Sequence, residues 1–122
     1  MKLIVAGSRT LDVSPIFIVD AIKLLDISDV TKIISGGCRG MDQAGEHWAS
    51  HFNTPVKRFE ADWKTHGKAA GPIRNREMAE YGDELLLIWD GNSRGSASMW
   101  KDMRKLKKKT HQIIILKNSK GL

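Results

Sequence analysis

Glycines and arginines recur at three places in the sequence, and the longest of these is the stretch 35–42, which reads SGGCRGMD. It follows a β-branched run and precedes residues with helical spacing, which predicts a strand, a tight loop and the start of a helix. At such a junction, backbone N–H groups and the positive end of the helix dipole point to one place, which suits phosphate. Glycine lets the backbone approach that phosphate closely. Gly36, Gly37 and Gly40 are therefore predicted to donate hydrogen bonds to phosphate, with Arg39 adding charge.

Two further glycine-rich loops follow apolar runs, at residues 7–9 (GSR) and 90–96 (DGNSRGS). In an open parallel sheet the carboxyl ends of the strands share one edge, and ligands bind there. Tight turns explain the glycines of any single loop equally well, but three such loops, each with an arginine, favour a ligand site. G-x-G-x-x-G is absent after the first apolar run, so ordinary NAD binding is not expected. The residues of these segments predicted to contact the ligand are Gly7, Ser8, Arg9, Ser35, Asp42, Asp90, Gly91, Ser93, Arg94, Gly95 and Ser96.

The segment 71–78 (GPIRNREM) places Arg74 and Asn75 at the start of a predicted helix, where both are expected to face the ligand. Arginine matches phosphate oxygens bidentately. Upstream, Asp62 is predicted to accept hydrogen bonds from ribose hydroxyls, a role shared with Asp90, and Trp63 to stack on a base. Packing of the Trp63 ring onto the body of the protein is an equal alternative.

For the other residues that could carry chemistry, an ordinary structural or surface role is favoured over a functional site. His47 and His51 have i, i+4 spacing but no third ligand at a suitable distance in sequence, so no metal site is expected. Cys38 has no histidine or acidic partner nearby in sequence, which favours a small loop residue over a nucleophile. The basic run 101–109 is interpreted as a solvated helix end stabilised by the dipole. Nucleic-acid binding there is the less favoured interpretation, because no aromatic stacking pattern accompanies the charge.

The elements that must position these residues alternate between strand and helix. Such alternation predicts a Rossmann-like α/β sandwich, in which helices cover both faces of a five-stranded parallel sheet. The connection 61–71 lacks either periodicity and is predicted to be a long irregular loop. One domain is expected over 1–117, with a flexible tail at 118–122. The predicted strands are 2–6, 32–35, 55–60, 84–89 and 112–116, and the predicted helices are 16–25, 41–52, 72–81 and a fourth with Met99, Met103 and Leu106 inward.

The composition fits an ordinary globular protein with an affinity for anions. The 122 residues are 41% hydrophobic and 28% charged, with a formal net charge of +6, which favours phosphate ligands or polyanions in general. No apolar run approaches the ~20 residues of a membrane span, and the N-terminal run is too short for a signal peptide. The single cysteine excludes an intrachain disulfide and fits a reducing cytoplasm.

Five segments taken together resemble a known family: 5–9 (VAGSR), 35–42 (SGGCRGMD), 61–63 (ADW), 70–78 (AGPIRNREM) and 89–96 (WDGNSRGS). They are similar to the YspA/YpsA-related branch of the SLOG superfamily, small Rossmann-like proteins of bacteria and their phages. The resemblance covers almost the whole chain. It implies strand order 3-2-1-4-5 and the binding of nucleotides or nucleotide-derived signals.

The same superfamily is related to the LOG enzymes, which cleave the N-glycosidic bond of nucleoside monophosphates, and to DNA-binding DprA. LOG enzymes carry an R-K-x-x-M helix, which Arg74 and Met78 match, with Asn75 in place of the lysine. They also carry P-G-G-x-G-T-x-E-E, in which the glutamate is catalytic. Gly95 and Ser96 match the G-T of that motif, but its acidic positions fall on serine and methionine. LOG-type catalysis is therefore not expected unless Asp42 or Asp90 substitutes.

The leading hypothesis is a cytoplasmic binding protein for a nucleotide or nucleotide-derived signal, acting as a sensor or sequestering module. The first alternative is a hydrolase acting on the glycosidic bond of a nucleotide. A weaker alternative is nucleic-acid binding through the basic C-terminal helix. A homodimer through Trp100 and the methionines of that helix is a further expectation, although core packing explains those residues as well. No membrane partner is expected.

Overall fold

A five-stranded sheet forms the centre of the protein, as seen in the computed structural model, which describes residues 1–8, 15–37 and 41–115. All strand pairs are parallel and the order is β3-β2-β1-β4-β5, which confirms the predicted sheet. The carboxyl ends of the strands therefore share one edge. The strands are β1 (Lys2–Gly7), β2 (Lys32–Ser35), β3 (Val56–Arg58), β4 (Glu84–Trp89) and β5 (Lys109–Ile114).

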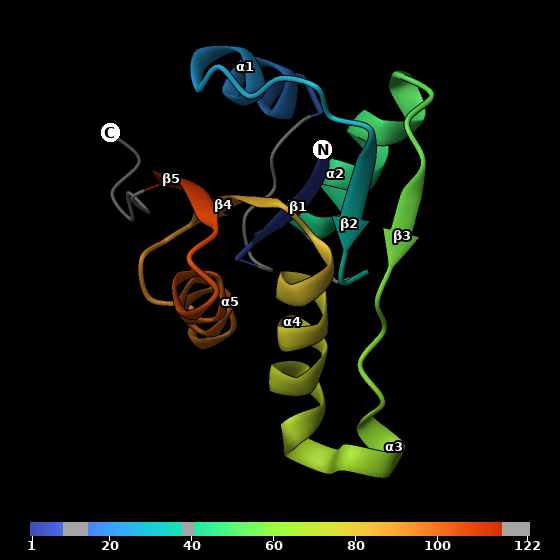
Figure 1. The fold of residues 1–122 in the computed structure, drawn as a ribbon, viewed down its shortest axis with the longest axis vertical. Coiled ribbons are helices and arrows are strands. Elements are labelled where there is room, and N and C mark those ends of the chain that lie inside the picture. The colour runs from blue at the N-terminus through green and yellow to red at the C-terminus, as the bar shows by residue number, and fades with distance from the viewer. Residues whose placement is uncertain (9–14, 38–40, 116–122) are drawn as a thin grey trace, which may run out of the picture.

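Four long helices cover the two faces of this sheet, so the protein has three layers (Figure 1). On one face, Ile18 of α1 and Trp48 of α2 pack against β1, β2 and β4. On the other face, Met78 of α4 and Met99 and Met103 of α5 pack against the same sheet. The long helices are α1 (Pro15–Leu24), α2 (Met41–His51), α4 (Ala70–Tyr81) and α5 (Arg94–Lys105).

The buried central strands follow from their continuous apolar sequence. Leu3, Ile4 and Val5 of β1 are fully buried, because their side chains alternate between the two cores. The edge strands differ: β3 has no buried residue and β5 buries only His111, whose Nε2 lies 2.6 Å from Oε1 of Glu84. Strand order and burial therefore agree with the hydrophobicity of each segment.

The predicted irregular loop 61–71 is wrong, because most of it is helical. It contains the one-turn helix α3 (Trp63–His66) and the 3₁₀ turn η1 (Gly67–Ala69), which lead directly into α4. That helix begins at Ala70, two residues before the predicted start at Pro72. Proline is tolerated within the first turn, since the N–H that it lacks has no intrahelical acceptor there.

Several predicted boundaries also change. β5 begins at Lys109 and ends at Ile114, and β3 is confined to Val56–Arg58. Phe52 and Leu106 were predicted to face the core, but they are 51% and 42% exposed. Both lie just beyond the last residue of a helix, where the helical face no longer points to the sheet.

The predicted tail 118–122 lies outside the described residues. None of the described helices has the length and apolar character needed to cross a membrane.

Lys108 is part of the basic run that the sequence suggested to be a solvated face, and the structure gives it a specific role. Its Nζ donates to the carbonyl oxygens of Ala79, Glu80 and Gly82 at 2.8, 2.9 and 2.7 Å. The last carbonyls of a helix have no intrahelical donors, so the ammonium group caps the C-terminus of α4 and favours its dipole.

Replacing Lys108 by methionine is expected to lower the free energy of unfolding by about 1–3 kcal/mol, because the carbonyls lose their donor while the aliphatic stem remains. Urea unfolding followed by circular dichroism measures this change. Lys109→Met removes a neighbouring exposed lysine and should change stability by less than about 0.5 kcal/mol. Equal effects of the two substitutions would show that general charge, and not the cap, matters.

Candidate functional site

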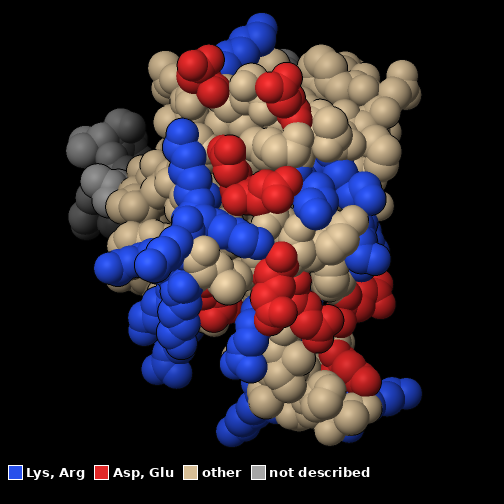
Figure 2. Space-filling view, viewed as in Figure 1, with Lys and Arg blue, Asp and Glu red and all other residues tan. Residues whose placement is uncertain are grey.

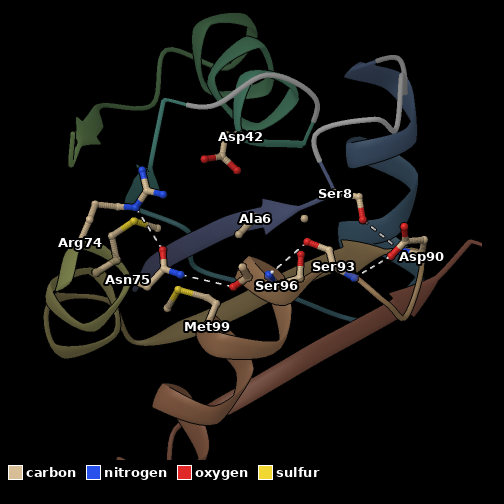
Figure 3. A pocket seen from close by; sticks show the side chains of 12 residues that line it. Ala6, Ser8, Asp42, Arg74, Asn75, Asp90, Ser93, Ser96 and Met99 are labelled. Atoms are coloured by element: carbon tan, nitrogen blue, oxygen red, sulfur yellow. Dashed lines mark hydrogen bonds between the residues drawn. The ribbon is translucent and has the colours of Figure 1, made fainter. Parts of the chain in front are cut away.

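A cavity of about 340 Å³ lies at the carboxyl ends of β1 and β4, between α4 and α5 (Figure 3). Its floor is apolar and includes Ala6, Met78 and Met99, which the sequence predicted only as core. Polar side chains surround that floor, so the cavity offers both kinds of surface to one ligand. The lining residues that were predicted as site residues are Gly7, Ser8, Asp42, Arg74, Asn75, Asp90, Ser93, Gly95 and Ser96.

The loop after β4 is shaped by Asp90. Its Oδ1 accepts hydrogen bonds from the N–H groups of Asn92 and Ser93 at 2.8 and 3.0 Å, and its own N–H donates to Ser8 Oγ at 3.1 Å. The N–H of Asn92, together with that of Ser93, holds the pKa of Asp90 below its usual value in spite of partial desolvation. Asp90 therefore fixes the turn that leads into α5, and the residue also lines the cavity. Gly91 has φ +87°, as this turn requires, and does not line the cavity.

The N-terminus of α5 borders the cavity. Ser93 is the N-cap, and its Oγ accepts from the N–H of Ser96 at 3.4 Å. The N–H groups of Arg94 and Gly95 belong to the first turn, so they have no acceptor within the helix. Ser96 is 96% buried from solvent, being 4% exposed, and its hydroxyl has no hydrogen-bond partner among the described residues. This end of α5 thus borders the cavity with the positive end of a helix dipole, and the buried Ser96 hydroxyl lies beside it.

Arg74 and Asn75 connect α4 to two of the loops. Arg74 Nη1 donates to the carbonyl of Gly36 at 2.9 Å, and its Nε donates to Asn75 Oδ1 at 3.1 Å. Asn75 Nδ2 in turn donates to the carbonyl of Gly95 at 3.3 Å. This chain of hydrogen bonds joins three segments that are far apart in sequence and holds the guanidinium at the cavity.

Gly36 lies between two charged groups. A Cβ at this position would lie 2.8 Å from Arg74 Nη1 and 2.8 Å from Asp42 Oδ2, closer than any side chain tolerates. Asp42 is buried in the first turn of α2 and lines the cavity from the side opposite α5 (Figure 3). A side chain at position 36 would therefore displace the ends of the Arg74 and Asp42 side chains from their present positions.

Gly37 has a different environment from the one predicted. Its φ is +73°, and its N–H donates to Ser35 Oγ at 3.0 Å, so this N–H already has an acceptor. Neither Gly37 nor Ser35 lines the cavity. The predicted hydrogen bond from the Gly37 N–H to phosphate does not fit this geometry, because the left-handed turn directs that N–H toward Ser35 Oγ. Arg39 and Gly40 lie outside the described residues, as does Arg9 of the first loop.

Glu46 and Arg58 brace this second loop, and sequence reasoning missed both. Ser35 Oγ donates to Glu46 Oε2 at 2.6 Å, and Arg58 Nε donates to the same oxygen at 3.1 Å. Burial would raise the pKa of Glu46, but the hydrogen bonds from Arg58 and Ser35 outweigh it and lower that pKa. The available signal was the spacing from Asp42 to Glu46, which places two carboxylates on one side of a helix next to the glycine loop.

Besides Ser35, Gly36, Gly37 and Gly91, three more of the predicted site residues do not line the cavity. Asp62 is the N-cap of α3, where its Oδ1 accepts from the N–H of Thr65 at 3.2 Å, and this contact with Thr65 lowers its pKa. Trp63 of α3 is 53% exposed, and its ring lies against Gly71 at the start of α4. This part of the chain projects beyond the sheet in Figure 1. Arg94 borders a separate groove on the other side of α5. The predicted ribose and base contacts of Asp62 and Trp63 therefore lack a shared cavity.

Comparison with known proteins gives one relative of note. The chain is 34% identical over 79 residues to the Gene 61 protein of Mycobacterium phage D29. The aligned part covers 60% of this chain and 63% of the phage protein, which is less than two thirds of that protein's length. No family model and no solved structure matches the chain. The similarity links the chain to a phage protein whose name states neither a ligand nor a reaction.

Proposed function

We propose that the cavity binds a nucleotide or a nucleotide-derived signal, and that the protein acts as a sensor or sequestering module. The observation that carries this proposal is the end of α5. There the Ser96 hydroxyl, which has no hydrogen-bond partner within residues 1–8, 15–37 and 41–115, accompanies two backbone N–H groups without intrahelical acceptors. A phosphate group supplies the acceptor oxygens and the negative charge that such a helix terminus favours.

The remaining surface of the cavity fits the rest of a nucleotide. Its volume of about 340 Å³ is within the range of small-molecule sites, and it combines an apolar floor with surrounding polar side chains. Met78 and Met99 offer polarizable surface to a base. Arg74 adds a guanidinium already oriented by Gly36 and Asn75, so little side-chain entropy is lost when it meets a phosphate.

The resemblance to the SLOG superfamily supports the same class of ligand. Of the residues that match the LOG motifs, Arg74, Met78, Gly95 and Ser96 all line the cavity. The acidic positions of the LOG motif correspond to Ser98 and Met99. Ser98 borders the groove on the other side of α5, and Met99 carries no charge, so neither places a carboxylate beside a glycosidic bond. Binding is therefore proposed ahead of cleavage.

The test is a panel of nucleoside mono-, di- and triphosphates, cyclic nucleotides and inorganic phosphate. We expect at least one nucleotide to raise the thermal midpoint by several degrees at ~100 times its Kd, since ligand at that concentration adds ~2.7 kcal/mol to stability. Chromatography of the same mixtures should recover the nucleotide unchanged.

Two outcomes would overturn the proposal. Release of free base would replace binding by hydrolysis, in which case Asp42 and Asp90 are the carboxylates at the cavity to substitute first. No shift with any nucleotide at millimolar concentration, while an unrelated anion such as citrate stabilises the protein, would remove nucleotides as the ligand class.

A further inference from the structure

A second groove, of about 400 Å³, lies on the other side of the contact between α4 and α5. It shares no residue with the cavity. Pro72 and Arg76 contribute from α4, and the remaining lining residues come from α5: Arg94, Ala97, Ser98, Lys101, Asp102 and Lys105. In Figure 2, basic side chains gather in the region where Figure 1 places α5.

The groove is strongly cationic. Arg76, Arg94, Lys101 and Lys105 face a single carboxylate, that of Asp102. Within the described part of the chain, none of these four cations has a carboxylate oxygen within 4.0 Å. Burial raises the pKa of Asp102, although Arg76 and Lys105 oppose that shift. One carboxyl among four cations offsets the positive charge of the groove only in part.

The cations also form a line. Arg94, Lys101 and Lys105 are spaced over the 12 residues of α5, and the rise of 1.5 Å per residue from the first to the last corresponds to roughly 16 Å. A smaller hollow bounded by Lys101, Arg104 and Lys105 adjoins the groove and continues the basic surface. A track of this length exceeds what one phosphate group contacts, so it favours an extended polyanion over a compact one.

We propose that this groove binds the phosphate backbone of nucleic acid. Nucleic-acid binding was the less favoured interpretation of the sequence because no aromatic stacking pattern accompanies the charge. The structure adds Arg76 from α4, which turns a basic face into a groove with cations on two walls. Without aromatic lining residues, the contact is with phosphates and is independent of base sequence.

A second copy of the chain is a poor occupant of the groove. A two-fold interface would bring the same patch of each subunit together, so the four cations would oppose their own copies. Like charges placed against each other across an interface cost several kcal/mol. A polyanion instead neutralises the cations and releases counterions.

The probe is a fluorescein-labelled oligothymidine of about 20 nucleotides, longer than the ~4–16 nucleotides of single-strand sites. Fluorescence anisotropy should show binding whose logarithm falls with the logarithm of salt concentration at a slope of about −3, as four neutralised phosphates predict. The triple variant Arg76→Gln/Lys101→Gln/Lys105→Gln should bind at least 10-fold more weakly, with a slope flatter by about 2.

The matched control is Lys23→Gln/Lys64→Gln/Lys68→Gln, which has the same net charge but changes exposed lysines on α1, α3 and η1. It should retain the wild-type affinity and slope, and equal losses in both triples would overturn the proposal. Ser96→Ala should also retain oligothymidine binding, since that residue belongs to the nucleotide cavity; loss of binding in this variant would assign the strand to the cavity instead.

Competition identifies the class of polyanion. Unlabelled oligothymidine should displace the probe, whereas poly-glutamate at the same charge concentration should displace it at least 10-fold less effectively. Equal displacement would overturn the assignment to nucleic acid in favour of an acidic polypeptide. The failure of either experiment is separate from the failure of nucleotide binding, because the mononucleotide panel reports on the other cavity.

Discussion

Ser96→Ala is expected to weaken nucleotide binding by about 10- to 100-fold while leaving the ligand-free protein at least as stable as the wild type. The weakening follows from the loss of one hydrogen bond to a charged phosphate, which contributes about 1.5–3 kcal/mol. Stability is retained because the Ser96 hydroxyl makes no hydrogen bond within the part of the chain that the structure describes, and alanine is the better helix former. Isothermal titration with the most stabilising nucleoside phosphate measures the first effect, and urea unfolding measures the second.

Two serines of the same helix provide matched controls. Ser93→Ala removes the N-cap and should lower the free energy of unfolding by about 1 kcal/mol. Ser98→Ala changes a serine that borders the other groove and should leave nucleotide affinity unchanged. If Ser96→Ala bound nucleotide as tightly as the wild type, the phosphate would lie elsewhere than at the end of α5. If it were markedly less stable, the hydroxyl would have a structural role.

The sheet could be predicted from the sequence because each strand carries its own signal. β1 and β4 are continuous apolar runs, which only a strand buried on both faces explains. The loops at the carboxyl ends then had to share an edge, which is why residues as distant as Ser8, Asp42 and Asn75 could be assigned to one place before the structure was known.

The sequence did not predict in which direction side chains point at the ends of helices and strands, because hydrophobic periodicity does not define a face there. Arg94 adjoins two cavity residues, Ser93 and Gly95, yet successive helical residues point about 100° apart, so it enters the other groove. The helix α3 was not predicted because it is a single turn, which is too short to show helical periodicity in the sequence. Lys108 lies in a basic run, and only the packing of β5 beside the end of α4 reveals that it caps a helix.

Gly82 directly follows the predicted helix 72–81, and glycine is common at such helix ends. In the structure it is the C-cap of α4, with its N–H donating to the Met78 carbonyl at 2.8 Å. Its φ is −78°, which any residue adopts, so conformational freedom does not require glycine here. Glycine is needed here because of the limited space: a Cβ at position 82 would lie 2.5 Å from Ile4 Cγ1 and 2.6 Å from Ile4 Cδ1.

Gly82→Ala should therefore lower the free energy of unfolding by about 1–3 kcal/mol or more, because an added methyl forces a well-packed core side chain to move. Ile4 is fully buried in the central strand, where its backbone pairs with Ile34 on one side and Leu85 on the other, so it has little room to shift. The matched control is Gly95→Ala, at which a Cβ meets no atom within 4 Å and alanine should stabilise the helix by up to ~1 kcal/mol.

A double-mutant cycle identifies the cause of the loss. Ile4→Ala removes both atoms that the new methyl would strike, at a cost of its own of about 2–5 kcal/mol. If the overlap is the cause, the double variant Ile4→Ala/Gly82→Ala should be less destabilised than the sum of the single variants by about 0.5–3 kcal/mol. Additive costs would place the defect in the cap and not in the contact with Ile4. Because that contact seats the end of α4 on β1, the cycle also measures how firmly the sheet holds the helix that carries Arg74 and Asn75.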